Sequence, residues 1–226
     1  MFDRLIKLIG ENAFNEIQQK NILVLGCGGV GGYVIEALIR SGIKKISILD
    51  YDMVDETNLN RQIIALHSTI GMLKTDVIEK RILDINPDVI IKKLTQKLDI
   101  KSIDKLKLDN YDYIVDAIDD VEVKIELIKF SQKFNINLIT STGTAKKLHP
   151  ELLSITTLDK TNGDPLAKKL RNKLKGYNLK KVKVLASTEA PITKGNTLAS
   201  SAFVPSVGGI MIASFIINDI IKNTLV

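Results

Sequence analysis

The stretch that decides the fold covers residues 21–61 and reads NILVLGCGGVGGYVIEALIRSGIKKISILDYDMVDETNLNR. A hydrophobic strand pattern leads into a glycine-rich turn, which is followed by a helix pattern, a second strand pattern and a cluster of acidic residues that ends in an arginine. Gly26, Gly28 and Gly31 fit the spacing G-x-G-x-x-G. The first glycine permits a tight turn, the second lets phosphate oxygens approach bare backbone, and the third lets the helix pack closely on the strand. This order of elements predicts a pocket for an adenine nucleotide.

The acid that ends the second strand pattern supports the same prediction. Asp50 stands where this type of fold places a carboxylate that holds a ribose hydroxyl. Phosphate would lie on the N-terminus of the helix after the glycines, because free N–H groups and the helix dipole favour negative charge there. Asp50 and Asp52 could alternatively be a solvated strand end or a helix cap.

Composition limits the class of protein. The chain has 226 residues, 45% hydrophobic and 26% charged, which is ordinary for a soluble globular protein. We expect one domain over residues 1–226 that includes an N-terminal helical arm over residues 1–20. The N-terminal segment contains acids and too short an apolar run for a signal peptide, so the expected compartment is the cytoplasm. A single cysteine excludes an internal disulfide and a zinc site built from cysteine pairs.

Strand and helix patterns continue to alternate as far as about Gly143. Helices are expected over residues 73–86 and 121–134, and strands over residues 89–94, 111–117 and 138–141. Beyond Gly143, residues 152–157 and 182–186 are expected strands that could pair with each other. The predicted fold class is therefore α/β, a Rossmann-like doubly wound, mostly parallel sheet with a C-terminal extension of the sheet and a C-terminal helix.

The uncharged run over residues 198–218 needs its own interpretation, because its length alone would allow it to span a bilayer. Pro205, the pair Gly208 and Gly209, and several serines dilute its hydrophobicity. A helix packed into the core or into a dimer interface is the better interpretation, and membrane association remains the alternative. We expect no stable membrane insertion.

The glycine pattern alone says little about the reaction, since most such patterns belong to dehydrogenases. The charged residues beyond Asp50 distinguish better between a dehydrogenase and an enzyme that acts on a triphosphate. Arg61 and Lys74 would neutralise negative charge that shifts during attack at a phosphorus, and Asp119, after a strand, could hold magnesium. A dehydrogenase would also need a substrate domain, for which little chain remains. Each cation could instead be a surface charge, and Asp119 could cap the following helix, although Asp120 is better placed for that.

Several motifs resemble those of the ubiquitin-activating enzyme superfamily, which includes the molybdopterin and thiamine biosynthesis adenylyltransferases: GCGGVG, LDYD, NLNRQ, GMLK and DAIDD. The chain is more similar still to the tRNA threonylcarbamoyladenosine dehydratases in LIGENAF, STGTAKKLHPELLSITTLDKTNGDPLAKKLR, STEAP and FVPSVGGIMIASF. The resemblance covers nearly the whole chain. It implies that ATP, with Mg²⁺, activates the substrate carboxylate as an acyl-adenylate. A nitrogen of the same substrate then closes a ring, and the modified adenosine in the anticodon loop of tRNA loses one water.

The resemblance also implies roles for individual residues. Gly29 would lie against the phosphates, Asp119 would face the metal and the reacting centre, and Arg4 would reach the nucleotide of the neighbouring subunit in a homodimer. The catalytic set is Arg61, Lys74 and Asp119. The expected nucleotide-binding set is Gly26, Gly28, Gly29, Gly31, Asp50, Asp52, Asn58, Arg61, Gln62, Lys74, Asp119 and Arg4.

A stretch over residues 168–183 contains only basic charges. Such a stretch is usually a solvated face or a mobile loop. Together with the resemblance, it leads us to expect RNA contact by a basic loop region over residues 160–195, because neutralisation of phosphates by lysine supplies most non-specific affinity for nucleic acid.

Two other functions remain open. One is an adenylyltransferase that activates the C-terminal glycine of a small ubiquitin-like sulfur-carrier protein, and the other is a non-catalytic nucleotide- or NAD-binding module. Relatives that transfer the acyl group to a thiol need a catalytic cysteine outside the glycine turn, whereas Cys27 lies within it and is expected to be a small filler. His67 and His149 have no neighbouring metal-ligand partner and are expected to be structural or exposed.

Overall fold

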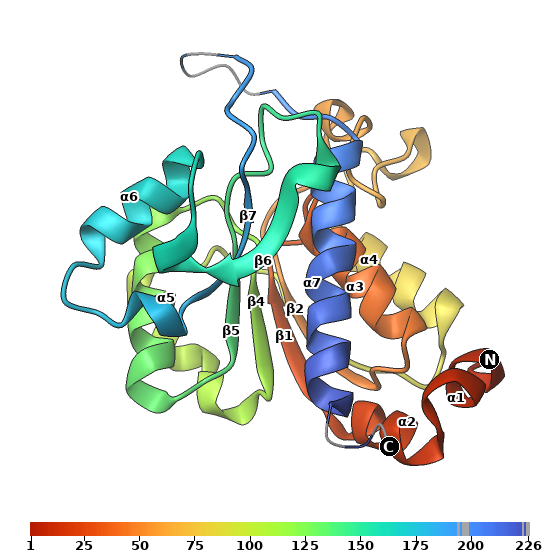
Figure 1. Ribbon diagram of the computed structural model, residues 1–226. Coiled ribbons are helices and arrows are strands. Elements are labelled where there is room, and N and C mark those ends of the chain that lie inside the picture. Colours follow the sequence, from red (N-terminus) through yellow and green to blue (C-terminus); the bar gives the residue numbers. More distant parts are fainter. Residues whose placement is uncertain (194, 196–198, 223, 225–226) are drawn as a thin grey trace.

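The computed structural model describes residues 1–193, 195, 199–222 and 224. Its centre is a seven-stranded sheet with helices on both faces (Figure 1). The strand order is β3-β2-β1-β4-β5-β7-β6. Neighbouring strands pair in parallel except β6 and β7, which pair antiparallel. The strands are β1 (Asn21–Leu25), β2 (Lys45–Leu49), β3 (Ile90–Leu94), β4 (Tyr113–Asp116), β5 (Leu138–Ser141), β6 (Leu153–Thr157) and β7 (Lys183–Ser187).

The predicted mostly parallel sheet is thereby confirmed, including its antiparallel extension after residue 143. Strand β1 lies inside the sheet between β2 and β4, and four of its five residues are buried because helices cover both faces. The chain builds one side of the sheet through β2 and β3 and then returns to β4 beside β1. The strand order therefore reverses between β1 and β4, at the position where open α/β sheets bind ligands outside the carboxyl ends of their strands.

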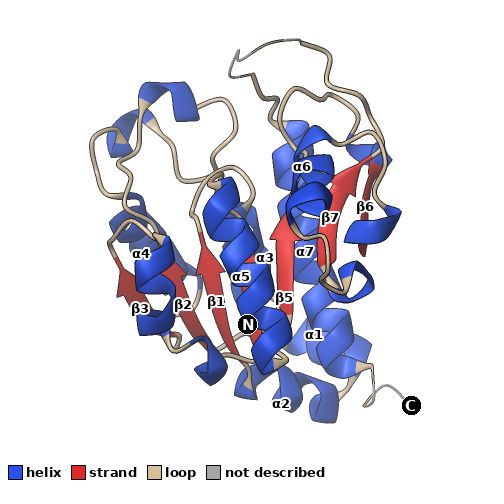
Figure 2. Cartoon of the chain, turned by 90° about the vertical axis from the view of Figure 1, so that its left-hand side faces the viewer, coloured by secondary structure: helices blue, strands red, loops and turns tan. Residues whose placement is uncertain are grey.

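One face of the sheet carries the helices α3 (Gly31–Arg40), α4 (Lys74–Ile85) and α7 (Phe203–Ile221). The other face carries α5 (Val121–Phe134) and the 3₁₀ helix Ile100–Leu106, with α6 (Pro165–Lys173) packed beside α5. Figure 2 shows these two layers on either side of the sheet. The expected boundaries of α4 and α5 differ from the observed ones by at most one residue.

Helix α7 is long and apolar enough to cross a membrane by length and composition, but 56% of the apolar window that meets this test is buried inside the structure. It runs beside α3 (Figure 1). A side chain added at Gly209 would begin 2.4 Å from the Val30 carbonyl oxygen, so the two helices approach closely because this position has no Cβ. The helix is therefore a core helix, as expected. The first residue of the expected run, residue 198, lies outside the described residues.

The N-terminal residues form two short helices, α1 (Asp3–Ile9) and α2 (Glu11–Gln19), joined at Gly10. Helix α2 buries Ala13, Phe14 and Ile17, whereas α1 has no buried residue. Because α2 leads directly into β1, both helices lie at the end of the sheet where the strands begin (Figure 2).

Candidate functional site

The turn between β1 and α3 shows which glycines the fold itself requires. Gly26 has φ +92°, and a Cβ there would lie 2.7 Å from the Ala117 carbonyl oxygen. A Cβ at Gly31 would lie 1.8 Å from the Gly26 carbonyl oxygen, so any side chain would force the turn apart. At Gly28 the nearest atom would be Gln62 Nε2, at 3.8 Å. The structure therefore needs Gly26 and Gly31 for packing, whereas Gly28 leaves bare backbone facing free space.

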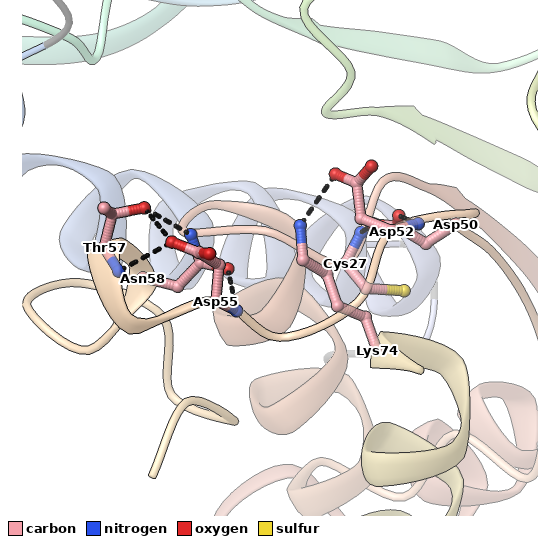
Figure 3. A network of polar contacts seen from close by, with 7 residues as sticks. All are labelled: Cys27, Asp50, Asp52, Asp55, Thr57, Asn58 and Lys74. Atoms are coloured by element: carbon pink, nitrogen blue, oxygen red, sulfur yellow. Dashed lines mark hydrogen bonds and ion pairs between the residues drawn. The ribbon is translucent and has the colours of Figure 1, made fainter. Parts of the chain in front are cut away.

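Asp50 fastens this turn to the acidic segment that follows β2. The residue is 8% exposed, and its carboxylate accepts hydrogen bonds from the Cys27 N–H at 2.7 Å and from the Asp52 N–H at 2.9 Å (Figure 3). Each carboxylate oxygen has further lone pairs, which leaves capacity for a ligand hydroxyl. Burial and the nearby Asp50 carboxylate raise the pKa of the Cys27 thiol well above its ordinary value, so Cys27 fills space, as expected.

Lys74 joins the same region at the first position of α4. Its ammonium lies 2.9 Å from the Asp52 carboxylate, and the exposed side-chain fractions are 7% for Lys74 and 47% for Asp52 (Figure 3). The Lys74 N–H also donates to the Asp52 carbonyl oxygen at 3.0 Å. The ion pair therefore holds the Lys74 ammonium group close to the glycine turn. Its partner, Asp52, is partly exposed, so a ligand phosphate could replace Asp52 as the partner of Lys74.

Asn58 and Arg61 lie on the segment between β2 and α4. The Asn58 side chain accepts from the Asp55 N–H at 3.2 Å and completes a capping box, so in this structure it stabilises a short 3₁₀ helix. The Arg61 guanidinium donates to the Thr57 carbonyl oxygen at 2.7 Å and to Asn60 at 2.9 Å. Gln62 is buried beside the Gly28 backbone, and its Oε1 has no hydrogen-bond partner among the described residues.

A cleft of about 1550 Å³ opens outside the carboxyl ends of β1, β4 and β5. It brings together Gly29, Arg61 and Asp119 from the predicted set. The opposite wall consists of residues 141–147 and 164–166. The other predicted residues are not among the described residues that line the cleft. Asp50, Asp52, Asn58 and Lys74 lie in the network of polar contacts drawn in Figure 3. Gln62 lies beside the turn, with its Nε2 3.8 Å from the position of a Cβ at Gly28.

Asp119 is exposed on the cleft, while Asp120 caps α5 by accepting from the N–H groups of Glu122 at 2.9 Å and Val123 at 3.1 Å. Asp119 is thus left without a capping role, as the sequence indicated. Within the described ranges, no cluster of three or more histidine, cysteine or acidic residues could hold a metal. A single exposed carboxylate fits Mg²⁺, which commonly uses one or two carboxylates together with substrate phosphates.

Arg4 does not reach the cleft of its own chain. It is exposed on α1, which lies at the opposite end of the sheet from the glycine turn (Figure 2). Part of the expected basic loop region over residues 160–195 is not a loop, because residues 165–173 form helix α6. Asp164 caps this helix through the N–H of Leu166 at 2.9 Å, and Pro165 occupies the first turn.

Sequence reasoning missed the ion pair beneath the cleft floor. Asp116 Oδ1 lies 2.9 Å from Lys124 Nζ, and both side chains are 0% exposed. Lys124 also donates to the Ser141 carbonyl oxygen at 3.0 Å, which ties β4, α5 and β5 together. Burial raises the pKa of the Asp116 carboxyl, while the Lys124 ammonium opposes this shift. The signal in the sequence was a lysine within the buried face of α5.

Comparison with known proteins agrees with this geometry. A model of the ThiF family matches residues 2–218. A tRNA threonylcarbamoyladenosine dehydratase of Bacillus subtilis (strain 168) is 37% identical, over 98% of this chain and 95% of the relative. The crystal structure of E. coli tRNA N6-threonylcarbamoyladenosine dehydratase in complex with ATP has a TM-score of 0.93 at 33% identity, and the match covers 99% of this chain and 94% of that chain. E. coli MccB with ATP has a TM-score of 0.70 at 21% identity over 98% of this chain and 64% of that chain, which shows a shared fold only.

The chain belongs to the ThiF family. Within this family it is a member of the branch formed by the tRNA threonylcarbamoyladenosine dehydratases, which the near full-length match to the Bacillus protein defines.

Proposed function

We propose that this chain is an ATP-dependent tRNA threonylcarbamoyladenosine dehydratase, which cyclises the modified adenosine through an acyl-adenylate. The single observation that carries the proposal is the bare backbone at Gly28 and Gly29 beside a cleft that also holds Arg61 and Asp119. The E. coli relative that matches the whole fold was solved with ATP. Backbone N–H groups at a helix N-terminus, together with a nearby cation, suit the phosphates of that nucleotide.

In the proposed reaction, ATP binds with its phosphates over residues 28–31 and its ribose near Asp50. The threonyl carboxylate attacks the α-phosphorus, a new O–P bond forms, and pyrophosphate leaves. Arg61 and Lys74 stabilise the negative charge that develops in this step, since fixed cations are most effective where charge appears in the transition state. Bound Mg²⁺, held by Asp119 and phosphate oxygens, would supply further charge neutralisation.

Ring closure follows on the same substrate. A carbamoyl nitrogen attacks the activated carbonyl carbon, the bond from this carbon to the AMP oxygen breaks, and the nitrogen loses its proton. The net change is loss of one water from the nucleoside, driven by conversion of ATP to AMP and pyrophosphate. Because the nucleophile is already attached to the electrophile, the step has the high effective concentration of an intramolecular reaction.

The tRNA would dock on α6 and the segment Leu179–Lys181. Helix α6 begins at Pro165, which lines the cleft, so RNA bound along the helix leads directly to the reacting centre. Most basic side chains of this surface are exposed, and Arg171 is the exception because it donates to the Thr161 carbonyl oxygen at 2.9 Å. The exposed residues are Lys168, Lys169, Lys173, Lys175, Lys180, Lys181 and Lys183.

We further propose a cytoplasmic homodimer in which Arg4 of each chain serves the neighbouring nucleotide site. Its support is that α1 presents no buried residue in the single chain and holds Arg4 far from the cleft of that chain. A dimer contact would give this helix a packing surface.

Exchange of labelled pyrophosphate into ATP tests the first half-reaction. Exchange that requires tRNA bearing the threonylcarbamoyl group supports the proposal. Exchange that requires a small carrier protein with a C-terminal glycine would instead establish the adenylyltransferase alternative, and tight ATP binding without exchange on either substrate would indicate a non-catalytic module.

A further inference from the structure

Lys147 lines the cleft but takes no part in the proposed reaction steps. It lines the wall opposite Arg61, it is 2% exposed, and within the part of the chain that the structure describes its ammonium group has no hydrogen-bond partner. A Cβ added at Gly143 would begin 2.6 Å from Lys147 Nζ and 2.1 Å from Asp164 Oδ2. The ammonium group therefore lies over bare backbone at the cleft wall, where only a glycine leaves it room.

The surrounding segments hold this lysine in place. The Lys146 N–H donates to the Ala199 carbonyl oxygen at 2.9 Å, and the Ile192 N–H donates to the Lys146 carbonyl oxygen at 2.9 Å. The Ser201 hydroxyl donates to the Lys147 carbonyl oxygen at 3.1 Å. Residues of the segment between β7 and α7 thus fix the backbone from which the Lys147 side chain extends.

The two nearby carboxylates are already occupied by backbone N–H groups. Asp164 Oδ2 accepts from the Gly143 N–H at 2.6 Å, and Asp164 Oδ1 caps α6. Glu189 accepts from the N–H groups of Leu148 at 3.0 Å and His149 at 3.0 Å. Neither acid forms an ion pair with Lys147 among the described contacts, which explains why this ammonium group remains unpartnered.

An unpartnered buried ammonium group destabilises a protein, because its loss of hydration is not compensated. Burial lowers the pKa of Lys147, although the charges of Asp164 and Glu189 act in the opposite direction. A purely structural side chain of the same length, such as methionine, would fit the wall without this cost. An anion that enters the cleft and binds the Lys147 ammonium group would remove this cost.

We propose that Lys147 binds the carboxylate of the acyl substrate, on the cleft wall opposite the nucleotide. The inference rests on the proposed function, which places the ATP phosphates against Gly29 and Arg61 on the other wall. The second anion that must enter the cleft is the substrate carboxylate. An ammonium contact to one carboxylate oxygen leaves the other oxygen directed at the α-phosphorus, so Lys147 would orient the nucleophile as well as bind it.

The test compares Lys147→Met with Lys147→Arg and with the control Lys80→Met, which removes an exposed lysine on α4. Binding to tRNA with and without the threonylcarbamoyl group is measured in the absence of turnover, together with the KM values for modified tRNA and ATP and the melting temperature. Lys147→Met should lose the preference for modified tRNA and raise its KM by about 10-fold or more, as expected for a lost hydrogen bond to a charged group. The KM for ATP should not change, and the melting temperature should stay equal or rise. Lys147→Arg should retain part of the preference, and Lys80→Met should resemble the wild type.

Three results would overturn the inference: an unchanged preference for modified tRNA in Lys147→Met, a raised KM for ATP with normal tRNA binding, or a lowered melting temperature that Lys147→Arg restores. The second would place Lys147 in the nucleotide site, and the third would make it structural. The binding comparison is independent of catalysis. A wild-type protein that prefers modified tRNA but forms no cyclic product would refute the proposed function and leave the carboxylate site standing.

Discussion

Replacement of Gly28 by alanine separates the role of the glycine turn in folding from its role in binding. The added Cβ would meet no atom closer than Gln62 Nε2 at 3.8 Å, which is an ordinary contact, and Gly28 does not have a positive φ. The free energy of unfolding should therefore change by less than about 1 kcal/mol. The same methyl group would occupy the space through which a phosphate oxygen reaches the backbone N–H groups.

The size of the binding defect follows from the hydrogen bonds that the methyl group blocks. An N–H to phosphate bond requires a donor–acceptor distance of about 2.9 Å, which a methyl group over the turn prevents. Loss of one such charge-assisted bond costs about 1.5–3 kcal/mol. We expect ATP affinity to fall by about 10- to 100-fold, since about 1.4 kcal/mol corresponds to a factor of ten.

Gly31→Ala is the matched contrast, because its Cβ would lie 1.8 Å from the Gly26 carbonyl oxygen and must displace backbone. This variant should lose about 2 kcal/mol or more of stability. Urea denaturation measures stability in both variants, and isothermal titration with ATP measures binding. Wild-type ATP affinity in Gly28→Ala would refute the placement of the phosphates, and an equal stability loss in both variants would refute the packing argument.

Three further predictions concern the charged residues. Arg61→Ala and Lys74→Ala should abolish AMP formation while circular dichroism stays unchanged, with Lys80→Ala as the control; near-normal turnover in both variants would remove them from the catalytic set. Lys124→Met should lower the free energy of unfolding by about 3–5 kcal/mol, because it leaves Asp116 buried without its cation. Adding Asp116→Asn to this variant should recover most of the loss. Wild-type stability of Lys124→Met in urea denaturation would contradict this prediction. Glutamine at Lys168, Lys169, Lys180 and Lys181 should weaken tRNA binding and reduce its dependence on salt concentration; an unchanged salt slope would place the RNA on another surface.

The fold was predictable because its signals are local. The glycine spacing, the two flanking strands and the alternation of helices with strands each depend on neighbours within the same short segment. The antiparallel pair β6 and β7 was also predictable from two strand patterns that follow the parallel units. The helix α6 was missed although Asp164 and Pro165 supply a cap and a first-turn proline, because the run of lysines was interpreted only as a charged surface.

The candidate site was less predictable because it depends on contacts between distant segments. Asp50 was expected to hold a ligand, but its bond to the Cys27 N–H becomes visible only when β1 and β2 lie side by side. Asn58 was expected at the phosphates, but its capping bond to the Asp55 N–H was not foreseen, because it depends on how the chain turns after β2. Lys147 and Asp164 both lie next to Gly143 because the start of α6 packs against the end of β5. No periodic pattern in the sequence predicts this contact.

The most direct measurement is mass analysis of tRNA nucleosides after incubation of the protein with ATP, magnesium and tRNA that carries threonylcarbamoyladenosine. We predict that this nucleoside is replaced by one lighter by the mass of one water, with AMP formed in equal amount and no product when ATP is omitted. An unchanged nucleoside mass in a sample that binds both ATP and tRNA would contradict the account.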